Sequence, residues 1–163
     1  MKLVTDALLD ELAVAAIASP RRRAHRELHE GGAADPLQRF LVVARADSFF
    51  APHRHHTRAE LCTMLRGTAE FLTFDDEGRV LQRQRVGTGA GAIACEMPPR
   101  TWHTVIPRSD VVAFLEVKLG PYDAKTAKEF APWSPAESDA GAVRLREWLD
   151  TAAPGERFTP RAG

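Results

Sequence analysis

The pattern of hydrophobic and polar positions changes twice along the chain, and each change predicts a different kind of element. Near the start, apolar residues recur four and then seven or eight positions apart, at Leu8, Leu12 and Ala15 or Ala16. This spacing predicts an amphipathic helix over residues 4–19. Thr5 is a suitable N-cap, and the Ser19-Pro20 step ends the helical pattern.

From Leu37 onward the helical period disappears, and short apolar or alternating runs follow one another with turn signals between them. These runs predict strands over residues 39–46, 48–53, 60–66, 69–74, 79–86, 92–97, 103–106 and 111–119. Asp-Asp-Glu-Gly at residues 75–78 predicts a hairpin loop between two of them. About eight short strands with no helix between them favour an antiparallel sandwich or barrel.

The two ends of the chain differ from this central part. Residues 21–30 are polar and rich in arginine, and with the Gly- and Pro-containing residues 31–36 they predict a linker. After Gly120 the chain is irregular until a short helix around residues 143–150. We therefore expect one domain, with a helix and Arg-rich arm packing on the barrel (1–36), the barrel itself (37–120) and a C-terminal segment wrapping it (121–163).

Composition narrows the class of protein. The 163 residues are 44% hydrophobic and 27% charged, as expected for a single globular domain. The 22 basic and 22 acidic residues cancel, so no overall field attracts nucleic acid. No apolar run is long enough to span a membrane, and Asp6, Asp10 and Glu11 do not fit a signal peptide. We expect a cytoplasmic protein in which Cys62 and Cys95 are free thiols.

The strongest chemical signal is a group of histidines at residues 53–56. Residues two apart on a strand point to the same side, so His53 and His55 face one volume while Arg54 faces away. Glu60 follows at the start of the next predicted strand, and Gly67 ends that strand, giving the pattern H-x-H-x4-E-x6-G. A tight connection brings the Glu60 carboxylate back over the two imidazoles.

Downstream, the proline-rich turn at residues 97–102 delivers His103 onto a later strand. Three neutral imidazoles and one carboxylate suit a first-row divalent metal such as Fe, Mn, Ni, Cu or Zn. We therefore predict a metal site at His53, His55, Glu60 and His103. In an octahedral site, four protein ligands leave about two positions open for a substrate or water.

Other residues are candidates for contact with a ligand, namely Arg21, Arg22, Arg23, Cys62 and Arg100. The three consecutive arginines form either a solvated face or a clamp for an anion such as a sugar phosphate. Cys62 lies two residues after Glu60 and should point into the barrel, either as a small buried hydrophobe or as a redox or ligating thiol.

For the remaining polar and aromatic residues we expect surface or packing roles, with a few alternatives. We expect His56 to be at the surface, with ligation of the metal as its alternative. We expect His25 and His29 to be exposed, with contact to a ligand as their alternative. Four further arginines carry unassigned surface or interface charge: Arg39, Arg54, Arg58 and Arg66. Three aromatic residues either pack the C-terminal segment on the barrel or form a lid over its mouth: Tyr122, Phe130 and Trp133.

These residues resemble a known family. His53, His55, Glu60 and Gly67 match the first cupin motif, and Pro98 with His103 matches the second. Three flanking segments resemble the WbuC family of cupin-fold metalloproteins: Ser-Pro-Arg-Arg-Arg-Ala-His at 19–25, Gly-Pro-Tyr-Asp at 120–123 and Lys-Glu-Phe-Ala-Pro-Trp at 128–133. Arg100 stands where the second motif has a glycine, a position that usually has φ > 0.

The resemblance implies an all-β, cupin-type antiparallel jelly-roll barrel with an N-terminal helix and a short C-terminal helix. It also implies a divalent metal ion (Fe, Mn, Ni or Zn) held by the three histidines and Glu60, and pairing as a homodimer. Because the family is associated with polysaccharide (O-antigen) gene clusters, we expect action on a sugar or sugar nucleotide in polysaccharide biosynthesis.

The alternatives are a non-catalytic cupin that binds or senses a small polar or anionic molecule, and a metal that only ties the strands together. Whether the protein is an enzyme stays open, since the sequence offers no obvious general base. We expect no nucleic-acid or membrane partner.

Overall fold

The computed structural model describes residues 1–159 and consists of two antiparallel five-stranded sheets and two α-helices. The first sheet has the order β1 (Arg23–Glu27), β2 (Leu37–Arg45), β9 (Val111–Leu119), β4 (Glu60–Arg66) and β7 (Ala94–Met97). The second has the order β10 (Glu129–Phe130), β3 (His53–Arg54), β8 (Trp102–Pro107), β5 (Thr68–Phe74) and β6 (Val80–Gly87). The helices are α1 (Asp6–Ala18) and α2 (Gly141–Thr151), and a 3-10 turn covers Gly32–Ala34.

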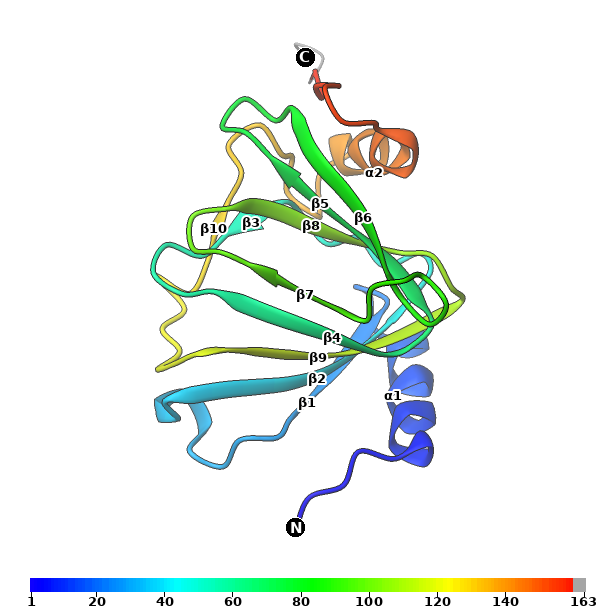
Figure 1. Ribbon diagram of the computed structural model, residues 1–163, viewed down its shortest axis with the longest axis vertical. Coiled ribbons are helices and arrows are strands. Elements are labelled where there is room, and N and C mark those ends of the chain that lie inside the picture. The colour runs from blue at the N-terminus through cyan, green and yellow to red at the C-terminus, as the bar shows by residue number, and fades with distance from the viewer. Residues whose placement is uncertain (160–163) are drawn as a thin grey trace.

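The two sheets face each other as a jelly-roll sandwich, and this confirms the predicted all-β, cupin-type fold with a helix at each end (Figure 1). Neither sheet closes on itself. The main core lies between the sheets, where apolar side chains of β2, β4, β5 and β9 meet, among them Val42, Met64, Phe71 and Phe114. Most of the predicted strands therefore owe their alternating pattern to one face that is buried in this core.

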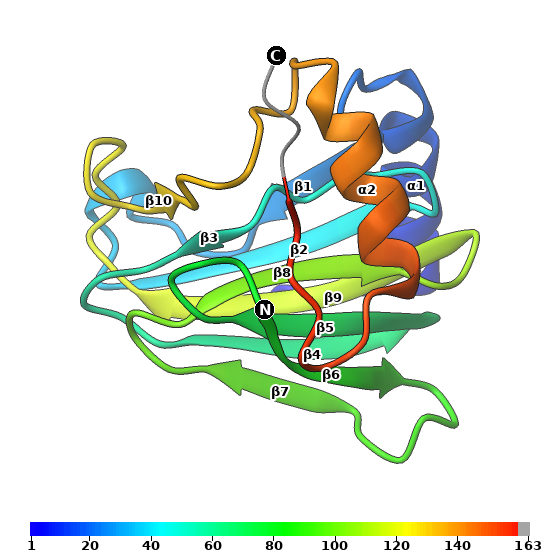
Figure 2. The same cartoon turned by 90° about the horizontal axis from the view of Figure 1, so that it is seen from above.

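The two helices cover different sheets (Figure 2). Helix α1 packs Leu9 and Leu12 against β2 and β9, and Thr5 caps it by accepting a hydrogen bond from the Leu8 N–H. Helix α2 packs Leu145 and Leu149 on the second sheet, beside Trp102 and other residues of that core. Both helices lie within two residues of their predicted bounds at each end.

Two predicted segments differ in the structure. The strand expected over residues 48–53 is reduced to β3, which pairs His53 with His103 of β8. The linker expected over residues 21–30 contains β1, which pairs antiparallel with β2 from Arg23 to Glu27. An edge strand at the surface gains its stability from backbone hydrogen bonds to its neighbour, so it needs no apolar alternation to identify it in the sequence.

Within residues 1–159, neither helix has the length and apolar character that crossing a lipid bilayer demands. The division of the domain into an arm, a barrel and a wrapping segment stays a prediction, and residues 160–163 of that last segment lie outside the described part of the chain.

Candidate metal centre

Four side chains from different parts of the sequence meet between the two sheets. His53 of β3 lies opposite His103 of β8, His55 follows β3, and Glu60 begins β4 in the other sheet. One ligand atom from each of the four lies within 4.8 Å of those of the others. His55, Glu60 and His103 are buried, and His53 is partly exposed. The structure thus places together the four residues that the sequence singled out.

The orientation of the imidazole rings is fixed by the backbone. In each histidine, Nδ1 lies at hydrogen-bond distance from a carbonyl oxygen: His53 with Ala51 (3.0 Å), His103 with Thr101 (2.8 Å) and His55 with Ala127. A carbonyl oxygen only accepts hydrogen bonds, so the proton of each neutral ring is on Nδ1. Each Nε2 is therefore left with a lone pair, which is the arrangement found in histidines that ligate a metal.

These lone pairs face a carboxylate. Nε2 of His55 lies 2.8 Å from Oε2 of Glu60, and Nε2 of His103 lies 3.6 Å from Oε1. Within residues 1–159, His103 Nε2 is buried and has no hydrogen-bond partner. Two electron-rich atoms at such short distance in a buried site repel each other unless a positive charge lies between them. A shared cation satisfies all of these groups at once.

The electrostatics of the cluster follow from its burial and its charges. Burial opposes ionisation of Glu60, but the Lys118 ammonium at 3.1 Å and the neighbouring imidazoles outweigh it and hold the Glu60 pKa well below its ordinary value. Burial also disfavours charge on His53 and, together with His103, lowers the pKa of His53. For His103 burial is outweighed by the Glu60 carboxylate, which raises its pKa. The protein therefore keeps the Glu60 carboxylate ionised and the His53 ring neutral, the states in which these two groups bind a metal.

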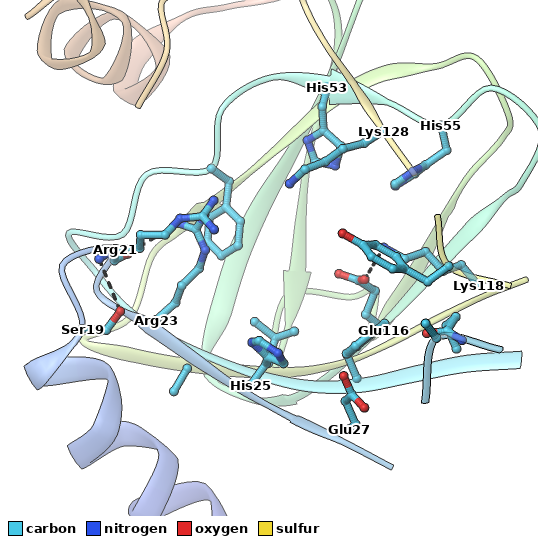
Figure 3. A pocket seen from close by; sticks show the side chains of 17 residues that line it. Ser19, Arg21, Arg23, His25, Glu27, His53, His55, Glu116, Lys118 and Lys128 are labelled. Carbon is cyan, nitrogen blue, oxygen red and sulfur yellow. Dashed lines mark hydrogen bonds and ion pairs between the residues drawn. The ribbon is translucent and has the colours of Figure 1, made fainter. Parts of the chain in front are cut away.

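The cluster lies at the edge of a cavity of about 580 Å³ (Figure 3). His53 and His55 line this cavity, whereas Glu60 and His103 are buried behind them. The volume is in the usual range for small-molecule sites. The remaining lining includes many polar and charged side chains, among them Gln38, Glu116, Lys118, Tyr122 and Lys128.

Sequence reasoning missed the charged pair Glu116 and Lys118 in this lining. Lys118 Nζ donates hydrogen bonds to Glu116 (2.5 Å) and to Glu60 (3.1 Å). It thus connects the cavity lining to Glu60, one of the four candidate metal-binding residues. Burial and then the charge of Glu60 raise the pKa of Glu116. Residues 116 and 118 point to the same side of β9 as the core residue Phe114. Two charged residues on the inward face of an otherwise apolar strand are the signal that would have found them.

Of the predicted ligand-binding residues, only Arg21 and Arg23 line the cavity. Both contact Glu137, at 2.7 and 2.8 Å. Arg22 does not line the cavity: it has φ of 57°, and its side chain contacts Asp47 at 2.9 Å. It therefore does not join its two neighbours in one clamp.

Cys62 and Arg100 lie near the cluster but do not line the cavity. The Cys62 thiol lies 3.8 Å from Glu60 Oε1, and burial raises its pKa well above the ordinary value, so it stays protonated. Arg100 has φ of 66°, the positive value expected at this position of the motif, where glycine is usual. Its backbone N–H donates a hydrogen bond to the His55 carbonyl at 2.6 Å. Despite the arginine at this position, His103 faces the cluster. A role of Arg22, Cys62 or Arg100 in ligand binding stays a prediction.

Two residues that we expected at the surface are buried. The His29 ring packs edge-on against Phe40, and its Nδ1 accepts a hydrogen bond from the Arg39 N–H at 3.1 Å. Arg58 donates from Nη1 to the Leu119 carbonyl at 2.9 Å. Each of these polar groups can be buried because a backbone group from another segment replaces water as its hydrogen-bond partner. A local sequence pattern does not reveal such a partner. His56, by contrast, is exposed as expected.

The fold and the site together define a cupin-type protein with a cluster of three histidines and one glutamate. Residues 4–86, about half of the chain, match one protein family, and the chain belongs to that family, described as "Domain of unknown function (DUF6016)". No curated protein matches the chain significantly.

Solved structures support the assignment of the fold. The chain is similar to a conserved protein with a double-stranded β-helix domain from Klebsiella pneumoniae, with a TM-score of 0.55, 15% identity, and coverage of 80% of this chain and 97% of that one. Protein SO0799 from Shewanella oneidensis gives a TM-score of 0.54 at 12% identity, over 81% of this chain and 87% of the other.

The DMSP lyase DddQ from Ruegeria pomeroyi is 28% identical, with a TM-score of 0.50 over 66% of this chain. This chain spans only about half of that lyase, 51%. The comparisons thus establish the fold and leave the ligand to be argued from the site.

Proposed function

We propose that the protein binds one divalent first-row transition-metal ion through His53, His55, Glu60 and His103, and uses it to hold a small polar molecule in the adjoining cavity. The observation that carries this proposal is the orientation of the three rings: their Nδ1 atoms face backbone carbonyls, and the Nε2 atoms of His55 and His103 face Glu60. Nitrogen and oxygen donors of this kind suit Fe, Mn, Ni or Zn.

The residues present fit such an ion. His103 Nε2 is a buried atom without a hydrogen-bond partner in residues 1–159, and His55 Nε2 faces a carboxylate oxygen. When bound, the ion supplies Lewis-acid chemistry toward a ligand oxygen. Glu60 supplies negative charge, and the backbone carbonyls hold the imidazole rings in place.

The other residues of the cavity favour a ligand that carries hydroxyl groups, such as a sugar or sugar nucleotide. Glu27, Gln38, Glu116 and Lys118 present side-chain acceptors and donors along the cavity. Lys118 donates hydrogen bonds to both Glu60 and Glu116, so it holds the acceptor Glu116 beside the metal cluster. A cavity with convergent polar groups next to a metal serves either a metal-dependent enzyme or a module that binds the same molecule without turnover.

Metal analysis tests this proposal. We expect the full-length protein, after incubation with Mn²⁺, Ni²⁺ or Zn²⁺ and removal of excess ion, to retain about one equivalent by elemental analysis. Loss of a residue that only hydrogen-bonds to a metal ligand typically lowers metal affinity by about 10–100-fold. His103→Ala removes a ligand itself, so it should lower the affinity for the metal by more than that. His56→Ala is the matched control, because this exposed histidine is adjacent to the cluster in sequence but not part of it. Equal metal content in wild type and His103→Ala would refute the proposal.

Three finer expectations belong to the same proposal. Membership of the WbuC family and a role in polysaccharide biosynthesis rest on the segments at residues 19–25, 120–123 and 128–133. Assembly as a homodimer rests on the resemblance to cupins. A cytoplasmic location is the third of these proposals.

A further inference from the structure

Positive charge is concentrated at one end of the cavity. Arg21, Arg23 and Lys128 all line this end, and in Figure 3 the amino group of Lys128 points toward the two arginines from beside His53. The acidic lining residues, Glu27 and Glu116, lie on the opposite side. The cavity is therefore polarised, and the candidate metal ligands His53 and His55 line the wall beside Lys128.

The arginines are held in place by a single carboxylate. Glu137 accepts two hydrogen bonds from Arg21, from Nε and Nη2 at 2.7 Å each, and one from Arg23 Nη2 at 2.8 Å. Arg23 Nη1 also donates to the Phe49 carbonyl at 2.8 Å, and its guanidinium stacks on the Phe50 ring at 4.4 Å. One negative charge thus faces two fixed positive charges, which leaves a net positive charge on a rigid wall.

Lys128 adds a second charge that no carboxylate balances. Its Nζ lies 4.8 Å from the centre of the Phe130 ring and makes no ion pair with an acidic side chain in residues 1–159. The neighbouring Glu129 points elsewhere, to Arg54 and His56. Burial and the positive charges of Arg21, Lys118 and Arg23 lower the pKa of Lys128, against a smaller opposing effect of the Glu137 carboxylate. Like charges in a cavity repel, and an anion placed among them relieves that repulsion.

From this arrangement, and resting on the function proposed above, we propose that the small molecule carries a carboxylate or phosphate group, bound between Lys128, Arg21 and Arg23. A second polar group of the same molecule reaches the metal centre at His53 and His55, and its hydroxyl groups face Glu27 and Glu116. The ligand class is thus a sugar acid or a sugar phosphate. Lys128 is the residue that selects the anion, because its ammonium forms no ion pair with a carboxylate in residues 1–159.

Calorimetric titration of the metal-loaded, full-length protein tests this inference, with glucuronate, glucose 1-phosphate and neutral glucose as probes. We expect at least one of the two anionic probes to bind more tightly than glucose, and the better one identifies the oxyanion. Lys128→Met should weaken its binding by about tenfold or more, because the variant loses a charge-assisted hydrogen bond to the anion.

Lys125→Met is the matched control, because Lys125 lies in the same segment but does not line the cavity. It should leave the affinity for the probe unchanged, and both variants should retain the metal content of the wild type. The inference is overturned if the metal-loaded protein binds neither anion more tightly than glucose, or if Lys128→Met binds them as well as wild type does.

Repeating the titration without metal separates this inference from the proposed function. If the protein binds no metal but still binds an anion through Lys128, the anion site stands and the metal proposal fails. If the metal binds and the anions do not, the metal proposal stands and the anion site fails.

Discussion

At the residue scale, the metal cluster depends on backbone atoms as much as on side chains. The carbonyls of Ala51 and Thr101 lie two residues before the histidines they orient, so these two contacts are local in the sequence. The third partner, Ala127, is 72 residues away from His55. The segment after Gly120 therefore completes the site, and its role extends beyond packing on the barrel.

Arg100 is the residue with the clearest local cost. A side chain at φ of 66° is strained by about 1 kcal/mol or more relative to glycine. We predict that Arg100→Gly raises the free energy of unfolding by roughly 0.5–1 kcal/mol, after the greater freedom of glycine in the unfolded chain is subtracted. Denaturant titration measures the change.

The control for this variant is Arg100→Ala, which removes the same side chain but keeps the strained Cβ. Its stability should match that of the wild type within experimental error. Equal stabilisation by glycine and alanine would mean that the arginine side chain, and not its backbone conformation, carries the cost.

At the scale of elements, Glu137 joins the arginines at the start of β1 to the C-terminal segment. Burial opposes ionisation of Glu137, but hydrogen bonds from Arg21 and Arg23 outweigh it and lower its pKa to about 2. The ordinary value is 4.5, so the ion pairs contribute their full stability above about pH 4.5. That contribution is lost as the pH falls from 4.5 toward 2.

We therefore predict that Glu137→Gln lowers the Tm of the metal-free protein at neutral pH and that this difference from wild type shrinks as the pH approaches 2. Because the pairs are partly exposed, the effect should be about 1 kcal/mol, or roughly 2–4 °C. Thermal denaturation between pH 2 and pH 7 measures it. Glu147→Gln, at an exposed carboxylate of α2, should show no such pH dependence. A constant difference for Glu137→Gln at all pH values would contradict the assignment.

At the scale of the whole molecule, the candidate ligands belong to both sheets. His53 and His103 come from β3 and β8 of one sheet, and Glu60 comes from β4 of the other. An ion bound by all of them ties the two halves of the sandwich together. Metal binding and folding should therefore be linked.

We predict that a metal concentration 100 times the Kd stabilises the protein by about 2.7 kcal/mol, which corresponds to a rise in Tm of roughly 5–10 °C. Thermal scans with Zn²⁺ or Mn²⁺ and with a chelator measure the rise. His53→Ala should lose it, while Lys125→Met should keep it. An equal rise in His53→Ala would assign the stabilisation to ions bound elsewhere.

The sequence by itself determined the parts of this protein that depend on local pattern. Alternating apolar residues indicate most strands because one face of each is buried, and the helical period with its Thr5 cap indicates α1. Gly67 ends β4 with φ of 70°, where a Cβ would lie 2.7 Å from the Val111 carbonyl oxygen, so the spacing of the first motif reflects backbone geometry. The motif spacing also singled out the four residues of the cluster.

Only the tertiary structure decided which distant groups meet. The arginines of residues 21–23 do not act alike, because Arg21 and Arg23 reach Glu137 and the cavity while Arg22 pairs with Asp47. Lys128 enters the cavity because β10 pairs with β3 and carries the preceding residues to the histidines. Such contacts join residues between 25 and 116 positions apart, and their energies depend on burial and charge at the point of contact. A periodic pattern carries no record of these quantities.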